Sequence, residues 1–242
     1  MRTFAGAVLA LVLPISLTAG ARPDTSASVV SFVLRDRHGH VAPVRTVATY
    51  SGGGLVDVQQ SAPDTIVVTM TGAVVAAAHP CHATSATMSF DLEQCFDVVF
   101  EKPDIKAAKL TAEARVTGLL RGGRAGAVAE SNGCATITRD GIGLVTLCVP
   151  DHGANGCENL SINDRSGSEA AIVGAGPHIL HASWHIAASQ PKAVLGRSAS
   201  ADFAPEPAVD PLWVGGPRDP FHGLNKKDFG FQVILRVASS PE

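Results

Sequence analysis

Residues Pro177–Ser189 have the sequence PHILHASWHIAAS, in which apolar and polar side chains alternate. From position 180 onward every even-numbered residue is apolar: Leu180, Ala182, Trp184, Ile186 and Ala188. The odd-numbered residues are polar apart from Ala187: His181, Ser183, His185 and Ser189. A period of two predicts a strand with one face in a core and the other face in water.

Two further segments, Thr65–Ala77 and Ala108–Leu120, carry the same period. The second is rich in Lys, Ala, Leu and Glu, which favour helices. Its even positions are nevertheless apolar or glycine, and its odd positions from Lys109 to Thr117 are polar. Because the period distinguishes a half-buried strand from a helix, we expect a strand here as well.

Strand-like segments follow one another along almost the whole chain, with no amphipathic helix between them. They are Ser28–Leu34, Val41–Tyr50, Leu55–Gln59, Thr65–Ala77, Thr84–Asp91, Cys95–Glu101, Ala108–Leu120, Ala127–Glu130, Cys134–Val149, Glu169–Gly174, Pro177–Ser189, Arg197–Phe203 and Phe229–Val237. Strands without crossover helices pair mostly antiparallel. We therefore predict an all-β, jelly-roll-like sandwich of two antiparallel sheets and about a dozen strands, with a closed β-barrel as the alternative.

The N-terminal residues have the composition of a secretory signal peptide. Met1-Arg2 precedes an apolar run from Phe4 to Leu17, and small residues follow at Ala19-Gly20-Ala21. The run is shorter than the roughly 20 residues of a membrane-spanning helix. We expect residues 1–21 to be removed near Ala21. Residues 22–242 would then form one secreted domain, extracellular or periplasmic, without a membrane span.

Charge gives no indication of a nucleic-acid partner. The chain has 19 basic and 22 acidic residues, and removal of residues 1–21 takes away one arginine. Neither sign forms a long run, whereas nucleic-acid binding needs a basic patch or stripe. Aromatic side chains for a binding surface are also few, with a single tyrosine, Tyr50.

Five cysteines in an exported chain imply disulfides and one remaining thiol. The stretch from Cys134 to Cys148 is predicted to be a hairpin that turns at Asp140-Gly141-Ile142. Pairing Arg139 with Gly143 would place Cys134 opposite Cys148, at a distance that a disulfide spans. We therefore predict this bond. Three cysteines stay unassigned: Cys81, Cys95 and Cys157.

Histidines are the candidate metal ligands of the sequence. On the predicted strand, His181 and His185 lie about 13 Å apart, too far to share an ion. His79 and His82 flank Cys81 and form the second group, but Cys81 is expected in a disulfide in an oxidising compartment. The sequence therefore predicts neither a metal nor a cofactor, and keeps His79 and His82 as the alternative ligands.

Residues 204–227 form a predicted loop of 24 residues with five prolines, longer than ordinary connections. Such loops are often functional. Trp213, Phe221 and His222 lie within it, and their rings could stack on or hydrogen-bond a sugar or a peptide. They are the candidate ligand-binding residues.

The sequence contains no assembled catalytic motif. The nearest match to a Gly-x-Ser-x-Gly nucleophile elbow, Gly196–Ser200, lacks the last glycine and falls in a predicted strand. We therefore expect a secreted, non-catalytic module with a structural, adhesive or ligand-binding role, whose ligand is a carbohydrate or a protein surface. The alternative is a secreted hydrolase or metal-dependent enzyme, in which some of the nine histidines converge from distant strands.

Overall fold

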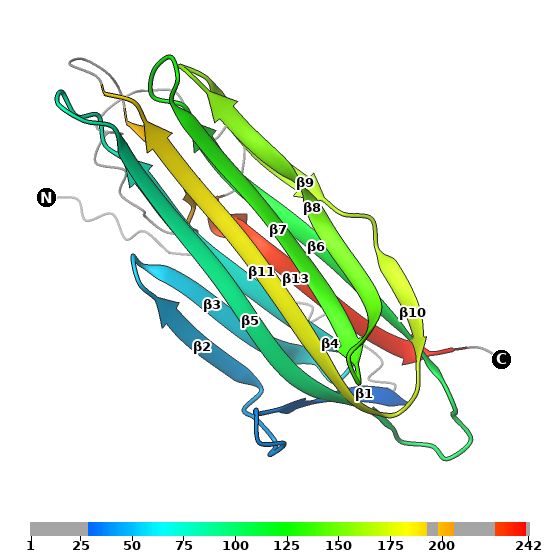
Figure 1. Cartoon of the computed structure of the whole chain (residues 1–242). Coiled ribbons are helices and arrows are strands. Elements are labelled where there is room, and N and C mark those ends of the chain that lie inside the picture. Colours follow the sequence, from blue (N-terminus) through cyan, green and yellow to red (C-terminus); the bar gives the residue numbers. More distant parts are fainter. Residues whose placement is uncertain (1–28, 193–197, 206–225, 241–242) are drawn as a thin grey trace, which may run out of the picture.

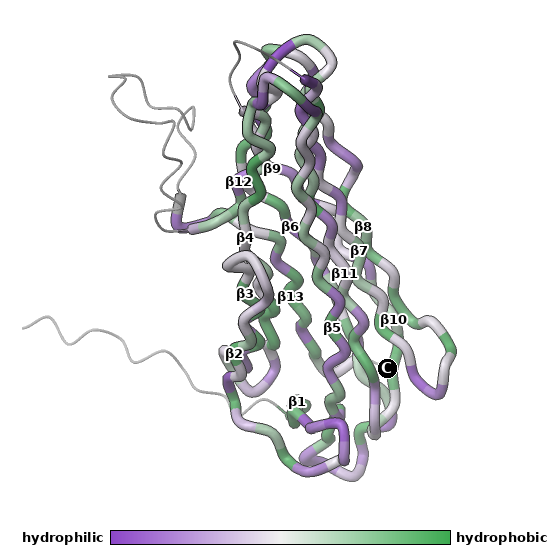
Figure 2. Tube along the Cα trace, turned by 60° about the vertical axis from the view of Figure 1, so that its left-hand side comes forward, coloured by the Kyte–Doolittle hydropathy of each residue, from purple (hydrophilic) through white to green (hydrophobic). Residues whose placement is uncertain are grey.

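The structure is a computed structural model that describes residues 29–192, 198–205 and 226–240. Within these ranges the chain forms two antiparallel sheets that face each other, as Figures 1 and 2 show from two sides. The predicted two-sheet β-sandwich is confirmed, and the single closed barrel is not what forms. The predicted signal peptide and the candidate ligand-binding residues Trp213, Phe221 and His222 lie outside the described residues.

The first sheet has five strands. Their order across the sheet is β1 (Val30–Arg35), β5 (Thr84–Phe100), β11 (Gly176–Gln190), β7 (Val128–Arg139) and β8 (Ile142–Asn155). The central strand β11 contains the alternating stretch quoted above. It pairs along its whole length with β5 and from Ile179 to Ser189 with β7.

The second sheet has eight strands. Its main path is β10 (Glu169–Val173), β6 (Ala108–Arg121), β12 (Ala199–Phe203), β4 (Thr65–Ala76), β3 (Gly54–Ala62) and β2 (Arg45–Tyr50). Two further strands, β9 (Asn159–Arg165) and β13 (Gly230–Ser239), also pair with β6. A short 3-10 helix, η1 (Lys226–Asp228), precedes β13. The predicted strand over 108–120 is therefore β6, the longest strand of this sheet.

The core lies between the sheets, and Trp184 is at its centre. The indole is 1 % exposed and stacks on Phe90 of its own sheet, with ring centroids 5.1 Å apart. From the opposite sheet, Phe203 meets it edge-on at the same distance. Its Nε1–H donates to the buried hydroxyl of Ser131 at 2.9 Å, which satisfies the one polar group of the ring. The even residues of Pro177–Ser189 are thus core residues, as predicted.

The segment from Thr84 to Phe100 corrects one prediction. We expected two separate strands, Thr84–Asp91 and Cys95–Glu101, but β5 is a single strand of 17 residues. Its inward positions keep one period of two from Met88 through Phe90 to Phe96, so the polar residues around position 93 only interrupt the apolar run. A polar interruption is a turn only when the period also breaks.

The β7–β8 hairpin has the predicted disulfide and a different turn. Asp140 and Gly141, with φ of 52° and 77°, form a two-residue turn, and Arg139 pairs with Ile142. Positive φ at both positions is typical of a type I′ hairpin turn with Asp-Gly. A bulge after Ile137 then restores the predicted pairing, so that Cys134 and Cys148 are bonded with Cα atoms 4.1 Å apart. In the described part of the chain, no helix has the length and hydropathy to cross a membrane.

Candidate functional site

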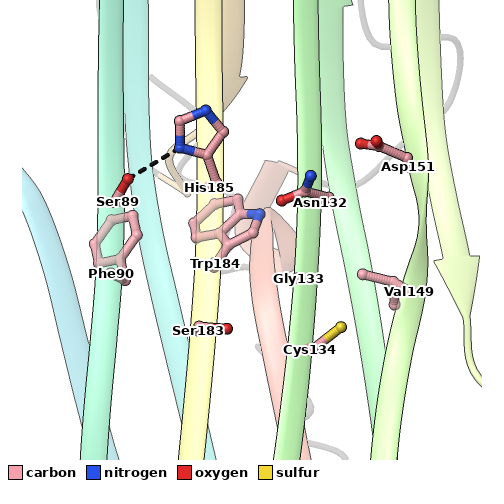
Figure 3. A pocket seen from close by; sticks show the side chains of 10 residues that line it. All are labelled: Ser89, Phe90, Asn132, Gly133, Cys134, Val149, Asp151, Ser183, Trp184 and His185. Atoms are coloured by element: carbon pink, nitrogen blue, oxygen red, sulfur yellow. Dashed lines mark hydrogen bonds between the residues drawn. The ribbon is translucent and has the colours of Figure 1, made fainter.

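The outer face of the five-stranded sheet carries a shallow pocket of about 430 Å³. Figure 3 shows the side chains that line it, which come from four neighbouring strands. Five of the residues that line it have polar or charged side chains: Ser89, Asn132, Asp151, Ser183 and His185.

Strand register places three of these residues in one row across the sheet. His185 of β11 lies opposite Ser89 of β5 on one side and opposite Asn132 of β7 on the other. Directly opposed side chains have Cβ atoms about 4.5–5.5 Å apart. The even-numbered side chains of β11 fill the core, so its odd-numbered side chains point outward. His185 and its neighbours in the row are therefore on the outer face.

The Ser89 hydroxyl lies 2.9 Å from Nδ1 of His185. Either group can donate, depending on the tautomer of the ring. Ser89 is exposed and His185 is half-buried, so a bound molecule could reach both. The pair offers one hydroxyl and one free imidazole nitrogen, Nε2, to the solvent side.

Asp151 reaches the same face through a bulge in β8. Ser131 pairs with His152 and Gly133 with Val149, so that two residues of β8, Pro150 and Asp151, lie opposite Asn132 alone. A bulge of this kind re-aims side chains, and the proline is tolerated because β8 is an edge strand. Figure 3 shows the carboxylate beyond Asn132, on the far side from His185.

Below the row, a glycine lets a core ring pack close to the sheet. Gly133 lies opposite Trp184, and a Cβ at this position would come within 2.9 Å of the Phe231 ring. The absence of a side chain therefore lets the core ring of Phe231 pack directly under the pocket. The floor is consequently rigid, since ladder hydrogen bonds hold it from the side and aromatic packing holds it from below.

The other histidines of β11 lie elsewhere. His181 is exposed on the outer face, with Nδ1 4.0 Å from Oε2 of Glu93, and does not line the pocket. His178 is 1 % exposed on the inner face and stacks on Phe96. Burial lowers the pKa of His178 below its usual value of 6.5. The hydrogen bond between its ring and the Gly174 carbonyl raises the pKa, but burial has the larger effect.

His79 and His82 lie close together, with ring centroids 3.7 Å apart. Nδ1 of His79 accepts a hydrogen bond from the Cys81 backbone N–H at 3.2 Å. The described residues contain no group of three or more histidine, cysteine and acidic side chains placed to hold a metal ion. Cys81 and Cys157 are exposed thiols, and burial raises the pKa of the half-buried Cys95 thiol.

A buried carboxylate, Glu113, lies on the outer side of the other sheet. It is 3 % exposed and is bound by Arg115, with Nε 2.5 Å from Oε1, and by Arg165, with Nε 2.6 Å from the same oxygen. Burial raises the pKa of this carboxyl, but the two guanidinium groups outweigh burial and hold the pKa below its usual value of 4.5. Its bonds are within the protein, so we assign it a structural role.

None of the five polar residues of the pocket was among the predicted site residues: Ser89, Asn132, Asp151, Ser183 and His185. Ser89 had one available signal, since it falls on the polar phase of a strand. Asp151 had none, because the bulge that turns it outward is not visible in the period of the sequence. The predicted candidates of the 204–227 loop lie outside the described residues and stay a prediction.

Comparisons with known proteins add little to this geometry. No protein-family model matches the chain, and no curated protein matches it. The solved structure of the infectious bursal disease virus Gx strain aligns with a TM-score of 0.20 and 10% identity, over 87% of this chain and 59% of the viral chain. T=1 particles derived from infectious bursal virus align with a TM-score of 0.14 and 10% identity, over 88% and 60%. The chain thus spans less than two thirds of these viral chains, and similarity this low carries no argument about function.

Proposed function

We propose that the protein is exported and binds a neutral carbohydrate, without catalysis, on the outer face of its five-stranded sheet. The observation that carries this proposal is the polar row of Ser89, His185 and Asn132, with Asp151 beside it, over a pocket of about 430 Å³. That volume falls within the usual range of about 300–1,000 Å³ for small-molecule sites.

The side chains of the row suit hydroxyl groups. A sugar hydroxyl both donates and accepts hydrogen bonds, and the row offers a hydroxyl, an imidazole, an amide and a carboxylate within a few strand spacings. Neither lysine nor arginine lines the pocket, and Asp151 would repel a like charge. These features favour neutral or amine-bearing glycans over acidic ones.

The geometry around His185 supports binding rather than hydrolysis. A serine–histidine pair becomes a nucleophile when a third group orients the imidazole. His185 has no ion pair among the described residues, and Asp151 is on β8, two strands or about 9–10 Å from β11. The surrounding backbone N–H groups bond to neighbouring strands, which leaves few of them to stabilise an oxyanion.

Export is supported by the sequence of residues 1–21 and by the Cys134–Cys148 disulfide. Disulfides persist in oxidising compartments and are rare in the cytosol. The Trp213–His222 segment is a second candidate contact for the same ligand. Removal of the signal peptide is testable by N-terminal sequencing of the released protein, where a start near Arg22 is expected.

The second candidate function is a secreted serine hydrolase, which the contact between Ser89 and His185 favours. A fluorophosphonate probe decides between the two. If the protein binds its ligand without catalysis, Ser89 of the purified protein should not react with the probe. Stoichiometric labelling of the wild type that is lost in Ser89→Ala would show that the protein is a serine hydrolase and would overturn the binding proposal.

The binding proposal itself is tested with a glycan panel of neutral, amine-bearing and acidic members, followed by calorimetric titration of the strongest neutral binder. His185→Ala and Asn132→Ala should each weaken binding about fivefold or more, since one hydrogen bond contributes about 1 kcal/mol. The matched control is His181→Ala, on the same strand and face but outside the pocket, which should leave affinity unchanged. Binding that none of the pocket variants alters would overturn the proposed site.

A further inference from the structure

The strand β2 is an edge of the eight-stranded sheet and is exposed on both faces. Residues 45–49 are all exposed, although their neighbour β3 is buried at every second position from Gly54 to Val58. Both faces of β2 are therefore uncovered, and Figure 1 shows the strand at the margin of the molecule. Three large apolar side chains lie in or beside it: Val41, Val44 and Val47, at 69%, 66% and 48% exposure.

The outward-facing backbone groups of β2 can be assigned from one hydrogen bond. The Gln60 N–H donates to the Val44 carbonyl at 2.7 Å, so Val44 faces β3. Residues alternate along an antiparallel ladder, so the backbone groups of Arg45, Val47 and Thr49 point away from β3. Among the described residues, β2 has no strand on that side.

Two other edges carry polar caps. At β1, the Phe32 N–H donates to the Pro63 carbonyl and the Phe32 carbonyl accepts from Gln60 Nε2. At β8, the Thr146 N–H donates to Glu169 and the Cys148 carbonyl accepts from the Ser166 hydroxyl.

Among the described residues, the outward backbone groups of β2 have no such cap, and the strand contains no proline. Its one charge, Arg45, is bound to Asp57 at 2.8 Å.

We propose that β2 is the contact surface for a second copy of this chain, paired antiparallel across a two-fold axis at Val47. Outward residues must face outward residues, so the register is limited to pairs of Arg45, Val47 and Thr49. Centring on Val47 pairs it with itself and places Arg45 opposite Thr49 of the second copy. About six backbone hydrogen bonds form in this register, two for each of three pairs.

The side chains fit the same register. Val44 lies opposite Tyr50 of the second copy, a pairing of β-branched and aromatic residues that stabilises sheets. No like charges meet, because Arg45 faces Thr49.

A shift of the two-fold toward Thr46 would bring Pro43 opposite Thr49 and lose a hydrogen bond, since proline has no N–H. The register centred on Val47 is thus self-complementary within β2 and involves no proline.

The test is the association state of the full exported chain, measured by sedimentation up to about 1 mM protein, where weak complexes populate. A reducing agent is included so that the exposed Cys81 and Cys157 cannot form cross-links. The wild type should show a reversible monomer–dimer equilibrium. Val47→Lys places two lysines opposite each other and should raise the dimer dissociation constant about tenfold or more.

Two further variants keep the result interpretable. Val47→Pro removes only an outward N–H, which the chain's own ladder does not use, and should also abolish the dimer while the protein stays folded. Ile172→Lys adds the same charge at another exposed apolar residue, on the opposite edge strand β10, and should dimerise like the wild type. A wild type that is monomeric throughout, or a dimer that survives both Val47 variants, overturns the proposal. An equal loss in Ile172→Lys does so as well.

Discussion

The hydroxyl of Ser89 and Nδ1 of His185 lie 2.9 Å apart, although 96 residues separate them in the chain. The contact exists because β5 and β11 pair in a register that sets the two residues opposite each other. Any slip of one residue would turn one of the two side chains into the core. The buried ring of Trp184, next to His185, fixes this register, and the site therefore depends on the core beneath it.

Replacement of Trp184 by alanine should lower the free energy of unfolding by about 3–5 kcal/mol, the usual cost of removing a large buried aromatic side chain. Trp184→Phe is the control: it keeps an aromatic ring in the core, loses the bond to Ser131 and should cost less than the alanine variant. Urea denaturation measures both. A loss for the alanine variant that is no larger than for the phenylalanine variant would contradict the central position of the indole.

The Cys134–Cys148 bond should appear as one cross-linked peptide when the unreduced protein is digested and analysed by mass spectrometry. Replacing both cysteines by serine should cost about 3 kcal/mol in the chain-entropy description of a 15-residue loop. Serine replacement of Cys81 and Cys157, both exposed, is the matched control and should cost little. Finding Cys134 linked to another cysteine would show that the hairpin register is wrong.

Glu113 should make stability depend on pH in the acid range. Its pKa is held below 4.5, so its ionised form stabilises the folded state fully above that pH. The contribution is lost as pH falls through the lowered pKa of the folded state. Glu113→Gln should therefore be less stable than the wild type at pH 7, and the difference should shrink below about pH 4.5. A difference that stays constant down to pH 3 would contradict the assigned pKa direction.

His178 should make stability depend on pH at higher pH than Glu113 does. Its pKa is lowered by burial from 6.5, so the unfolded chain takes up a proton before the folded protein does. Stability should therefore decrease as pH falls from 6.5 toward the pKa of the folded state. Below that pKa, His178 should cause no further change in stability. His178→Phe, which can keep the stack on Phe96, should remove that decrease. An unchanged pH profile between pH 7 and 5 would refute the prediction.

The fold class follows from the sequence because the period of two is a local property. The stretch Pro177–Ser189 already separates core from surface in β11, and the Asp-Gly turn locates the hairpin that carries the disulfide. Where the prediction was wrong, a local cue misled: the polar residues around Glu93 resemble a turn, although β5 continues through them. The period, and not the composition, was the better guide.

The candidate site could not be predicted in the same way. Ser89 and Asn132 come from β5 and β7, which long-range pairing brings beside β11, and Asp151 comes from β8 on the other side of β7. Local periods in the sequence do not give the order of strands in a sheet. Asp151 additionally requires the bulge at Pro150, where two residues face one. From the sequence we selected Trp213, Phe221 and His222 in the segment 204–227 instead. The composition of a segment can be read from the sequence, whereas the convergence of residues from different strands cannot.

The most direct test of carbohydrate binding on the sheet is a titration of ¹⁵N-labelled protein with the strongest neutral glycan from the panel, followed by NMR. The chain has two tryptophans, so the indole signal of Trp213 reports on the segment 204–227 separately from the sheet, which contains Trp184. We predict that the side-chain amide of Asn132 and the ring nitrogens of His185 shift in proportion to occupancy. Shifts confined to Trp213 and its neighbours, with Asn132 and His185 unmoved, would contradict the proposed site.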